Sequence, residues 1–127
     1  MKIKFVYGIL PAFVFYTERV PIAVAGRANA FVVRIRPSYA GDEGILQHEL
    51  THVKQAYRLL LIGHAMLYIF SKRYRYAAEV EAYKAQLRHS VLWDSDRNRF
   101  AEFICTRYRL DVSFWETYTL LGANSWT

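Results

Sequence analysis

The spacing of apolar residues along the chain changes near residue 42. Before that point, short apolar segments rich in β-forming residues are separated by prolines. The clearest is 31–36, in which Val33 and Ile35 alternate with arginines, as in a strand with one covered face. We therefore predict a small N-terminal antiparallel sheet with strands in 2–7, 20–25 and 31–36. The last of these strands is expected to border any cleft beside the helix that follows.

A helix is predicted from Asp42 or Glu43 onward. Asp42 is a good N-cap residue, because its carboxylate can accept a hydrogen bond from a backbone N–H group of the first helical turn. One apolar face then repeats every three or four positions, at Leu46, Leu50, Val53, Tyr57 and Leu60. The residues 48, 52 and 55 lie on a different stripe of this helix.

Further helical patterns follow. Small residues at 78, 82 and 85 indicate a second long helix that can pack closely against a neighbour. After a turn expected at Asp94–Asp96, helical spacing resumes through Phe100, Phe103, Ile104 and Tyr108. Ser113 and Glu116 form a capping box for a last helix that ends at Gly122. The aromatic residues of these two C-terminal helices are expected to fill the core.

Composition fits one domain. The chain has 127 residues, of which 54% are apolar and 17% aromatic, enough for one well-filled core. No low-complexity segment, long linker or repeat divides it. We expect a single α+β domain over residues 1–127, in which the sheet packs on a helical core and two C-terminal helices complete the shell.

The candidate chemistry lies in the segment His48–His52, which reads H-E-L-T-H. On a helix, side chains four positions apart lie one turn above each other, with Cβ atoms about 5–6 Å apart. Both imidazoles can therefore bind one ion. Glu49 lies beside them, where its carboxylate can accept a proton from metal-activated water. The pattern predicts His48 and His52 as metal ligands and Glu49 as a general base.

A catalytic zinc needs a third protein ligand, and a carboxylate on the second long helix is the best source. Glu79 and Glu81 are about 200° apart on that helix, so only one of them can face the metal. Glu79 shares its face with Ala82 and Tyr83, the side expected to meet the first helix. A continuous helix to Phe70 would end too far away to return Glu79 to the histidines. We therefore predict a turn at Ile62–His64, around Gly63, followed by a short apolar helix or connector to Ser71.

These residues carry a resemblance. His48–His52 followed by Glu79-Val80-Glu81-Ala82-Tyr83 resembles the gluzincin-type zinc metallopeptidases, in which H-E-x-x-H on one helix is completed by a Glu on another. The spacing is similar to the E-x-E-A-D element of CAAX-type and heat-shock peptidases, whose first Glu binds zinc and matches Glu79. Together with Gln55, the motif also resembles the H-E-x-x-H-x-x-Q of small uncharacterised bacterial and phage peptidases. The resemblance covers residues 42–90. It departs at Tyr83, where those peptidases have an Asp that orients a ligand.

The resemblance implies a zincin-like helical core and a zinc-dependent metallopeptidase that hydrolyses peptide bonds. Zinc would be bound by His48, His52 and Glu79, and Glu49 would act as the general base. The same ligand set also suits Fe(II) or Co(II). Gln55 either hydrogen-bonds near the site or is solvated. Candidate donors to a developing oxyanion are Tyr74, Arg75, Tyr76 and Tyr83, whereas His64 and His89 are expected to be packing or surface residues.

Two alternatives stay open. The formal net charge is +6, and arginines and lysines are interleaved with tyrosines around 72–76 and 97–109. Such a mixture can bind nucleic acid or an anionic surface. The other alternative is a zinc-binding protein without peptidase activity.

Neither apolar stretch, 5–16 or 59–70, reaches the roughly 20 residues that a membrane-spanning helix needs. The N-terminus has no compact apolar core followed by a clear cleavage site, although Ala23-Val24-Ala25 resembles one. We therefore expect a cytoplasmic protein, with a secreted or periplasmic one as the alternative. The single Cys cannot form an internal disulfide.

Overall fold

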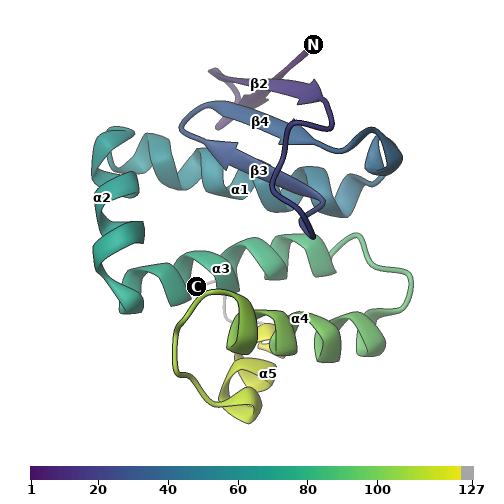
Figure 1. The fold of residues 1–127 in the computed structure, drawn as a ribbon, viewed down its shortest axis with the longest axis vertical. Coiled ribbons are helices and arrows are strands. Elements are labelled where there is room, and N and C mark those ends of the chain that lie inside the picture. Colours follow the sequence, from purple (N-terminus) through teal and green to yellow (C-terminus); the bar gives the residue numbers. More distant parts are fainter. Residues whose placement is uncertain (124–127) are drawn as a thin grey trace.

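A four-stranded sheet precedes five α-helices in the computed structural model, which describes residues 1–123 (Figure 1). The strands are β1 (Lys2–Val6), β2 (Leu10–Tyr16), β3 (Gly26–Asn29) and β4 (Val32–Ile35). A short 3-10 helix, η1 (Pro37–Tyr39), leads to α1 (Glu43–Arg58), α2 (Ile62–Phe70), α3 (Lys72–Leu87), α4 (Trp93–Arg107) and α5 (Phe114–Gly122). The predicted α+β class is confirmed.

The sheet is mixed, with strand order β1-β2-β4-β3. The outer pairs β1–β2 and β3–β4 are antiparallel, the arrangement expected for the sheet in general, although no strand was predicted at β2 or β3. The antiparallel prediction is wrong for the central pair, because β2 and β4 are parallel, with Phe13 opposite Val32 and Tyr16 opposite Ile35. After β2 the chain passes over the position next to it and forms β3 at the outer edge, then turns back to form β4 between β2 and β3. These two reversals make β4 parallel to β2. Apolar alternation does not encode that strand order.

The strand predicted at 20–25 is also wrong, and β2 occupies part of a stretch for which no strand was predicted. Residues 20–25 form an irregular loop in which the carbonyls of Val20, Pro21 and Val24 accept hydrogen bonds from Arg36. Pro21 has no N–H to give to a ladder, and Ala23 has a φ of 71°. The Arg36 side chain, directly after β4, therefore donates to the loop carbonyls that strand pairing would otherwise satisfy.

The turn between α1 and α2 lies at Leu59–Leu61, just before the predicted position. Leu60 and Leu61 adopt φ values of 54° and 61°. Gly63 is inside the first turn of α2, where an added Cβ would lie 3.3 Å from the Leu59 Cβ. Gly63 thus permits close approach of α2 to the end of α1 and does not itself form the turn.

Side-chain caps begin three of the helices. Asp42 accepts a hydrogen bond from Ile45 N, Ser71 from Tyr74 N, and Ser113 from Glu116 N, which confirms the predicted starts of α1 and α5. The predicted turn at Asp94–Asp96 is wrong, because these residues form the first turn of α4. Acidic side chains are favoured there by the helix dipole.

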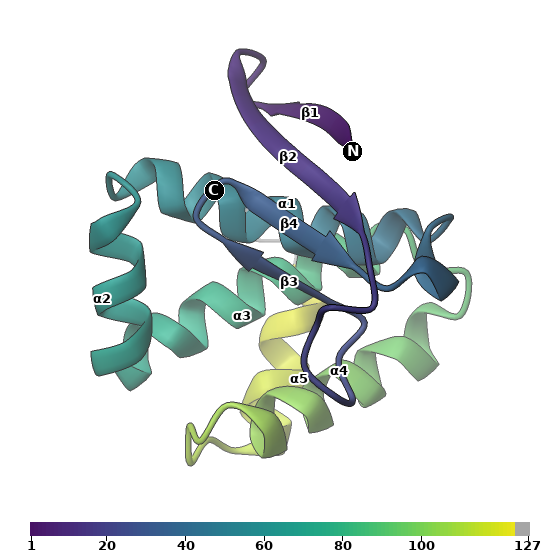
Figure 2. The same cartoon turned by 45° about the horizontal axis from the view of Figure 1, so that its top comes forward.

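Two apolar clusters flank a polar seam. The first joins the sheet to one face of α1, and the second joins α3, α4 and α5. In Figures 1 and 2, α1 lies between the sheet and α3. The facing sides of α1 and α3 bury polar residues, namely His48, Glu49, Gln55 and Glu79. No helix within residues 1–123 has the length and apolar character needed to cross a membrane.

Candidate metal centre

The two histidines of the motif project from α1 toward α3. His48 and His52 lie one turn apart, and their ring centroids are separated by 5.1 Å. Leu50 and Val53 on another face of α1 are buried in the cluster with the sheet. Because that face is fixed against the sheet, the imidazoles are held on the side that meets α3.

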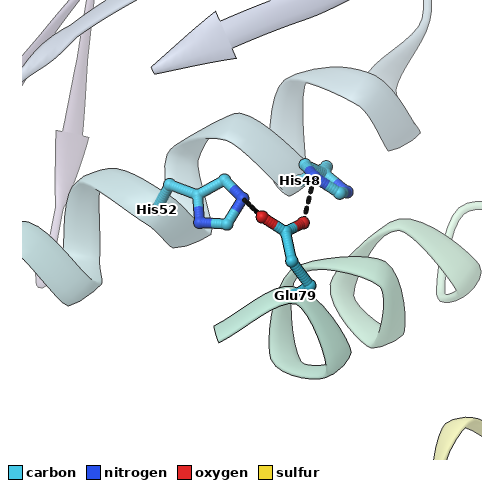
Figure 3. Close-up of side chains that lie close together, drawn as sticks. All are labelled: His48, His52 and Glu79. Atoms are coloured by element: carbon cyan, nitrogen blue, oxygen red, sulfur yellow. Dashed lines mark ion pairs between the residues drawn. The ribbon is translucent and has the colours of Figure 1, made fainter. Parts of the chain in front are cut away.

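Glu79 reaches the histidines from α3. Its Oε1 lies 3.5 Å from His48 Nε2, and its Oε2 lies 3.3 Å from His52 Nε2 (Figure 3). One possible ligand atom from each of the three residues lies within 4.8 Å of the others. The Glu79 side chain is 2% exposed. The three predicted ligands are therefore brought together, two from α1 and one from α3.

Glu81 does not face this centre. Its Oε1 accepts hydrogen bonds from Gln55 Nε2 and from Arg58, both at 2.7 Å. Of the two carboxylates considered on α3, it is Glu79 that lies between the imidazoles.

Gln55 orients His52. Its Oε1 is 2.9 Å from His52 Nδ1, while its Nε2 donates to Ala78 O and Glu81 Oε1. These two acceptors fix the direction of the amide, so Oε1 must accept a hydrogen from Nδ1. Nε2 is therefore the nitrogen that faces Glu79, and in the neutral ring its lone pair would be available to a metal.

His48 has a different support. The Tyr83 ring lies edge-on to it, with ring centroids 4.3 Å apart, and the Tyr83 hydroxyl bonds to that of Tyr108 at 2.8 Å. His48 Nδ1 is buried without a hydrogen-bond partner. His48 is therefore held by ring packing against Tyr83, with no hydrogen bond to its Nδ1.

Ionisation at the centre is strongly coupled. Burial raises the pKa of Glu79, but His52 and His48 oppose it and hold that pKa well below its usual range. Burial lowers the pKa of His52, but the charge and hydrogen bonding of Glu79 outweigh it and raise this pKa to about 9. Burial raises the pKa of Glu49, which the two histidines only partly offset. Without a metal, a proton on His52 therefore compensates the charge of Glu79.

The chemistry of this centre fits a divalent cation. The buried side-chain N and O atoms of residues 1–123 that lack a hydrogen-bond partner are His48 Nδ1 and Glu79 Oε1, both in this cluster. Tetrahedral zinc with bonds of about 2.0–2.1 Å separates its ligand atoms by about 3.3 Å. Each imidazole Nε2 lies 3.3 or 3.5 Å from one of the two Glu79 oxygens, and the three ligand atoms, one from each residue, lie within 4.8 Å of one another. Two buried carboxylates, Glu49 and Glu79, also supply the charge that a divalent ion neutralises.

A cavity of about 730 Å³ opens over the centre. Its lining includes Glu49, the three candidate ligands, and residues of the edge strand β3. The last strand, β4, was expected to border the cleft. That expectation is wrong, because β4 lies inside the sheet between β2 and β3.

Two residues of α2 were not identified as site residues from the sequence. The Tyr68 hydroxyl donates a hydrogen bond to Glu79 Oε2, and the His64 ring centroid lies 6.3 Å from that of His52. Both line the cavity. They are four residues apart within the apolar run 59–70. This spacing places both side chains on one face of a helix, which is the sequence signal that could have identified them.

The donors suggested for an oxyanion have other partners. Tyr76 bonds to Thr117, Tyr83 to Tyr108, and Tyr74 to His64 Nδ1. The Arg75 guanidinium donates to three backbone carbonyls. His89 is exposed. Tyr68 is the tyrosine whose hydroxyl bonds to a candidate ligand.

Many cations of the predicted basic surface have internal partners. Lys72 pairs with Asp111, Arg99 with Asp96, and Arg97 bonds to Tyr118 O. The two ion pairs lower the net charge that this surface offers to nucleic acid, whereas the carbonyl contact only orients Arg97.

Comparison of the chain with protein-family models, with curated proteins and with solved structures gave no match. The interpretation of the centre therefore depends on its own geometry.

Proposed function

We propose that the protein is a zinc-dependent metallopeptidase. The observation that carries this proposal is the convergence of two imidazoles and a buried carboxylate on one point, with Glu49 beside them in an open cavity. Two nitrogen donors and one oxygen donor form a common catalytic zinc set that keeps one position open.

His48, His52 and Glu79 would hold the ion, with Gln55 and Tyr68 fixing His52 and Glu79. Zinc bound there supplies Lewis-acid activation of water and of the scissile carbonyl. Glu49 accepts the proton of the attacking water on its carboxylate and delivers it to the nitrogen of the leaving amine. The cavity above the centre gives a peptide access to Glu49.

Metal analysis combined with a cleavage assay tests this function. Purified protein should contain one zinc per chain, and His48→Ala and Glu79→Ala should each lose it. His89→Ala is the matched control, because His89 is exposed outside the cluster and its replacement should leave the zinc content unchanged.

Glu49→Gln separates the peptidase from a zinc protein without activity. The variant should keep its zinc and lose at least about 100-fold in the hydrolysis of a peptide mixture, since a general base contributes about 10²–10⁴-fold. Zinc retained with no hydrolysis by the wild-type protein would leave only the metal-binding role. Absence of zinc from the wild-type protein would contradict the proposal.

A further inference from the structure

Four arginines line the cavity over the candidate metal centre. Arg27 belongs to the edge strand β3 and Arg75 to α3. Arg107 is the last residue of α4, and Arg109 lies two residues after it. The same lining also includes the carboxylates of Glu49 and Glu79.

Arg75 has a structural role. It donates to Tyr68 O at 2.6 Å, to Ile69 O at 3.2 Å and to Tyr108 O at 3.0 Å. The Tyr108 hydroxyl is also bonded, and Leu110 is buried. Arg107 and Arg109 therefore flank an anchored residue, so the segment that carries them is fixed.

The other three arginines of the cavity have no carboxylate partner in the described part of the chain. Elsewhere in the chain, Arg36, Arg58 and Arg99 each pair with an acid at 2.7–2.8 Å. Arg107 stacks on the Phe103 ring, with its Cζ 3.7 Å from the centroid. Stacking leaves the in-plane N–H groups of a guanidinium available to an anion.

Arg27 lies beside a second cation and close to the reactive carboxylate. In the β3–β4 register it is directly opposite Arg34, which also has no acidic partner within residues 1–123. Like charges in this position destabilise a sheet. Arg27 and Glu49 line the same cavity, where the charge of Arg27 acts to lower the pKa of Glu49 against the larger effect of burial. An anion bound by Arg27 would relieve the repulsion and lie near the general base.

We propose that the cleft selects peptides that carry carboxylates next to the bond to be cleaved, bound by Arg27 together with Arg107 and Arg109. The carboxylate can belong to an acidic side chain or to the C-terminus of the peptide. This substrate class rests on the proposed function. Cations from separate elements around one buried centre favour a short anionic ligand over a long polyanion that follows a continuous basic track.

Peptide binding tests the proposal without depending on turnover. The zinc-incubated Glu49→Gln protein is titrated by calorimetry with two N-acetyl hexapeptides in which a central Ala-Ala is flanked by either Glu or Gln residues. The Glu peptide should bind about tenfold more tightly, with a ratio that falls as salt is added. Amidated and free-acid forms of both peptides separate side-chain from terminal carboxylate recognition.

Single substitutions locate the effect. Arg27→Gln and Arg109→Gln should each reduce the Glu-to-Gln affinity ratio by about threefold or more. Arg73→Gln is the matched control, because this exposed arginine of α3 lies outside the cavity and its loss changes the net charge equally. Thermal melting confirms that each variant is folded.

A wild-type ratio near one would overturn the inference, and so would an equal loss in the Arg73 control or tighter binding of a single-stranded oligonucleotide than of the Glu peptide. Failure of the proposed function would look different. Absence of zinc or of cleavage leaves the ratio unchanged, whereas a ratio near one overturns the selectivity even in an active peptidase.

Discussion

Gln55 links the two helices of the metal centre through a single amide. Its Oε1 accepts from His52 Nδ1, and its Nε2 donates to the carbonyl of Ala78, the residue directly before Glu79. The same side chain therefore fixes the ring of one candidate ligand and the backbone that carries another. A partner of this kind determines how well a ligand set is preorganised for metal binding.

Replacement of Gln55 by Ala should weaken zinc affinity by about 10–100-fold while leaving all three ligands in place. The affinity can be measured by competition with a chromophoric chelator. Gln47→Ala is the control, because Gln47 lies on the same helix but bonds to Glu43 at the exposed surface. Equal zinc affinity of the Gln55 variant and the wild-type protein would show that His52 needs no such support.

At the scale of elements, the centre depends on the close approach of α1 and α3. Small residues make this approach possible, because Ala56 of α1 and Ala82 of α3 are completely buried and Ala78 is 3% exposed. Ala82 lies one turn from Glu79 on the same face. A larger side chain there would separate the helices and move Glu79 away from the imidazoles.

Ala82→Leu should therefore lower both the free energy of unfolding, by about 1–3 kcal/mol, and the zinc affinity. Ala101→Leu is the matched comparison, because Ala101 is equally buried but lies in the cluster of α3, α4 and α5. It should lower stability without a comparable loss of zinc affinity, as measured by denaturant unfolding and chelator competition. A normal zinc affinity in the Ala82 variant would mean that metal binding does not depend on the close approach of α1 and α3.

The helical part of the site was predictable because its signals are local or periodic. The spacing of His48 and His52, the Asp42 cap, and the face shared by Glu79 and Ala82 each depend on residues of one helix only, α1 for the first two and α3 for the third. The strand order, the loop at 20–25 and the hydrogen bond from Tyr68 to Glu79 depend on tertiary contacts. A pattern of apolar residues does not record which strands pair or which tyrosine of ten meets a given carboxylate.

At the scale of the whole molecule, the protein has two apolar clusters separated by a polar seam. The cluster with the sheet orients α1, the cluster of α3, α4 and α5 orients α3, and the candidate ligands occupy the seam between them. Arg27 of β3 and the segment 107–109 after α4 both line the cavity above the seam. Each half of the molecule thus supplies part of the centre and part of the cleft above it.

A crystal structure of the zinc-loaded protein, with anomalous data collected at the zinc absorption edge, tests the central claim most directly. The account predicts one strong peak between α1 and α3, about 2.0–2.2 Å from the Nε2 atoms of His48 and His52 and from a carboxylate oxygen of Glu79. A zinc peak bound by other residues, or no peak at these three side chains, would contradict it.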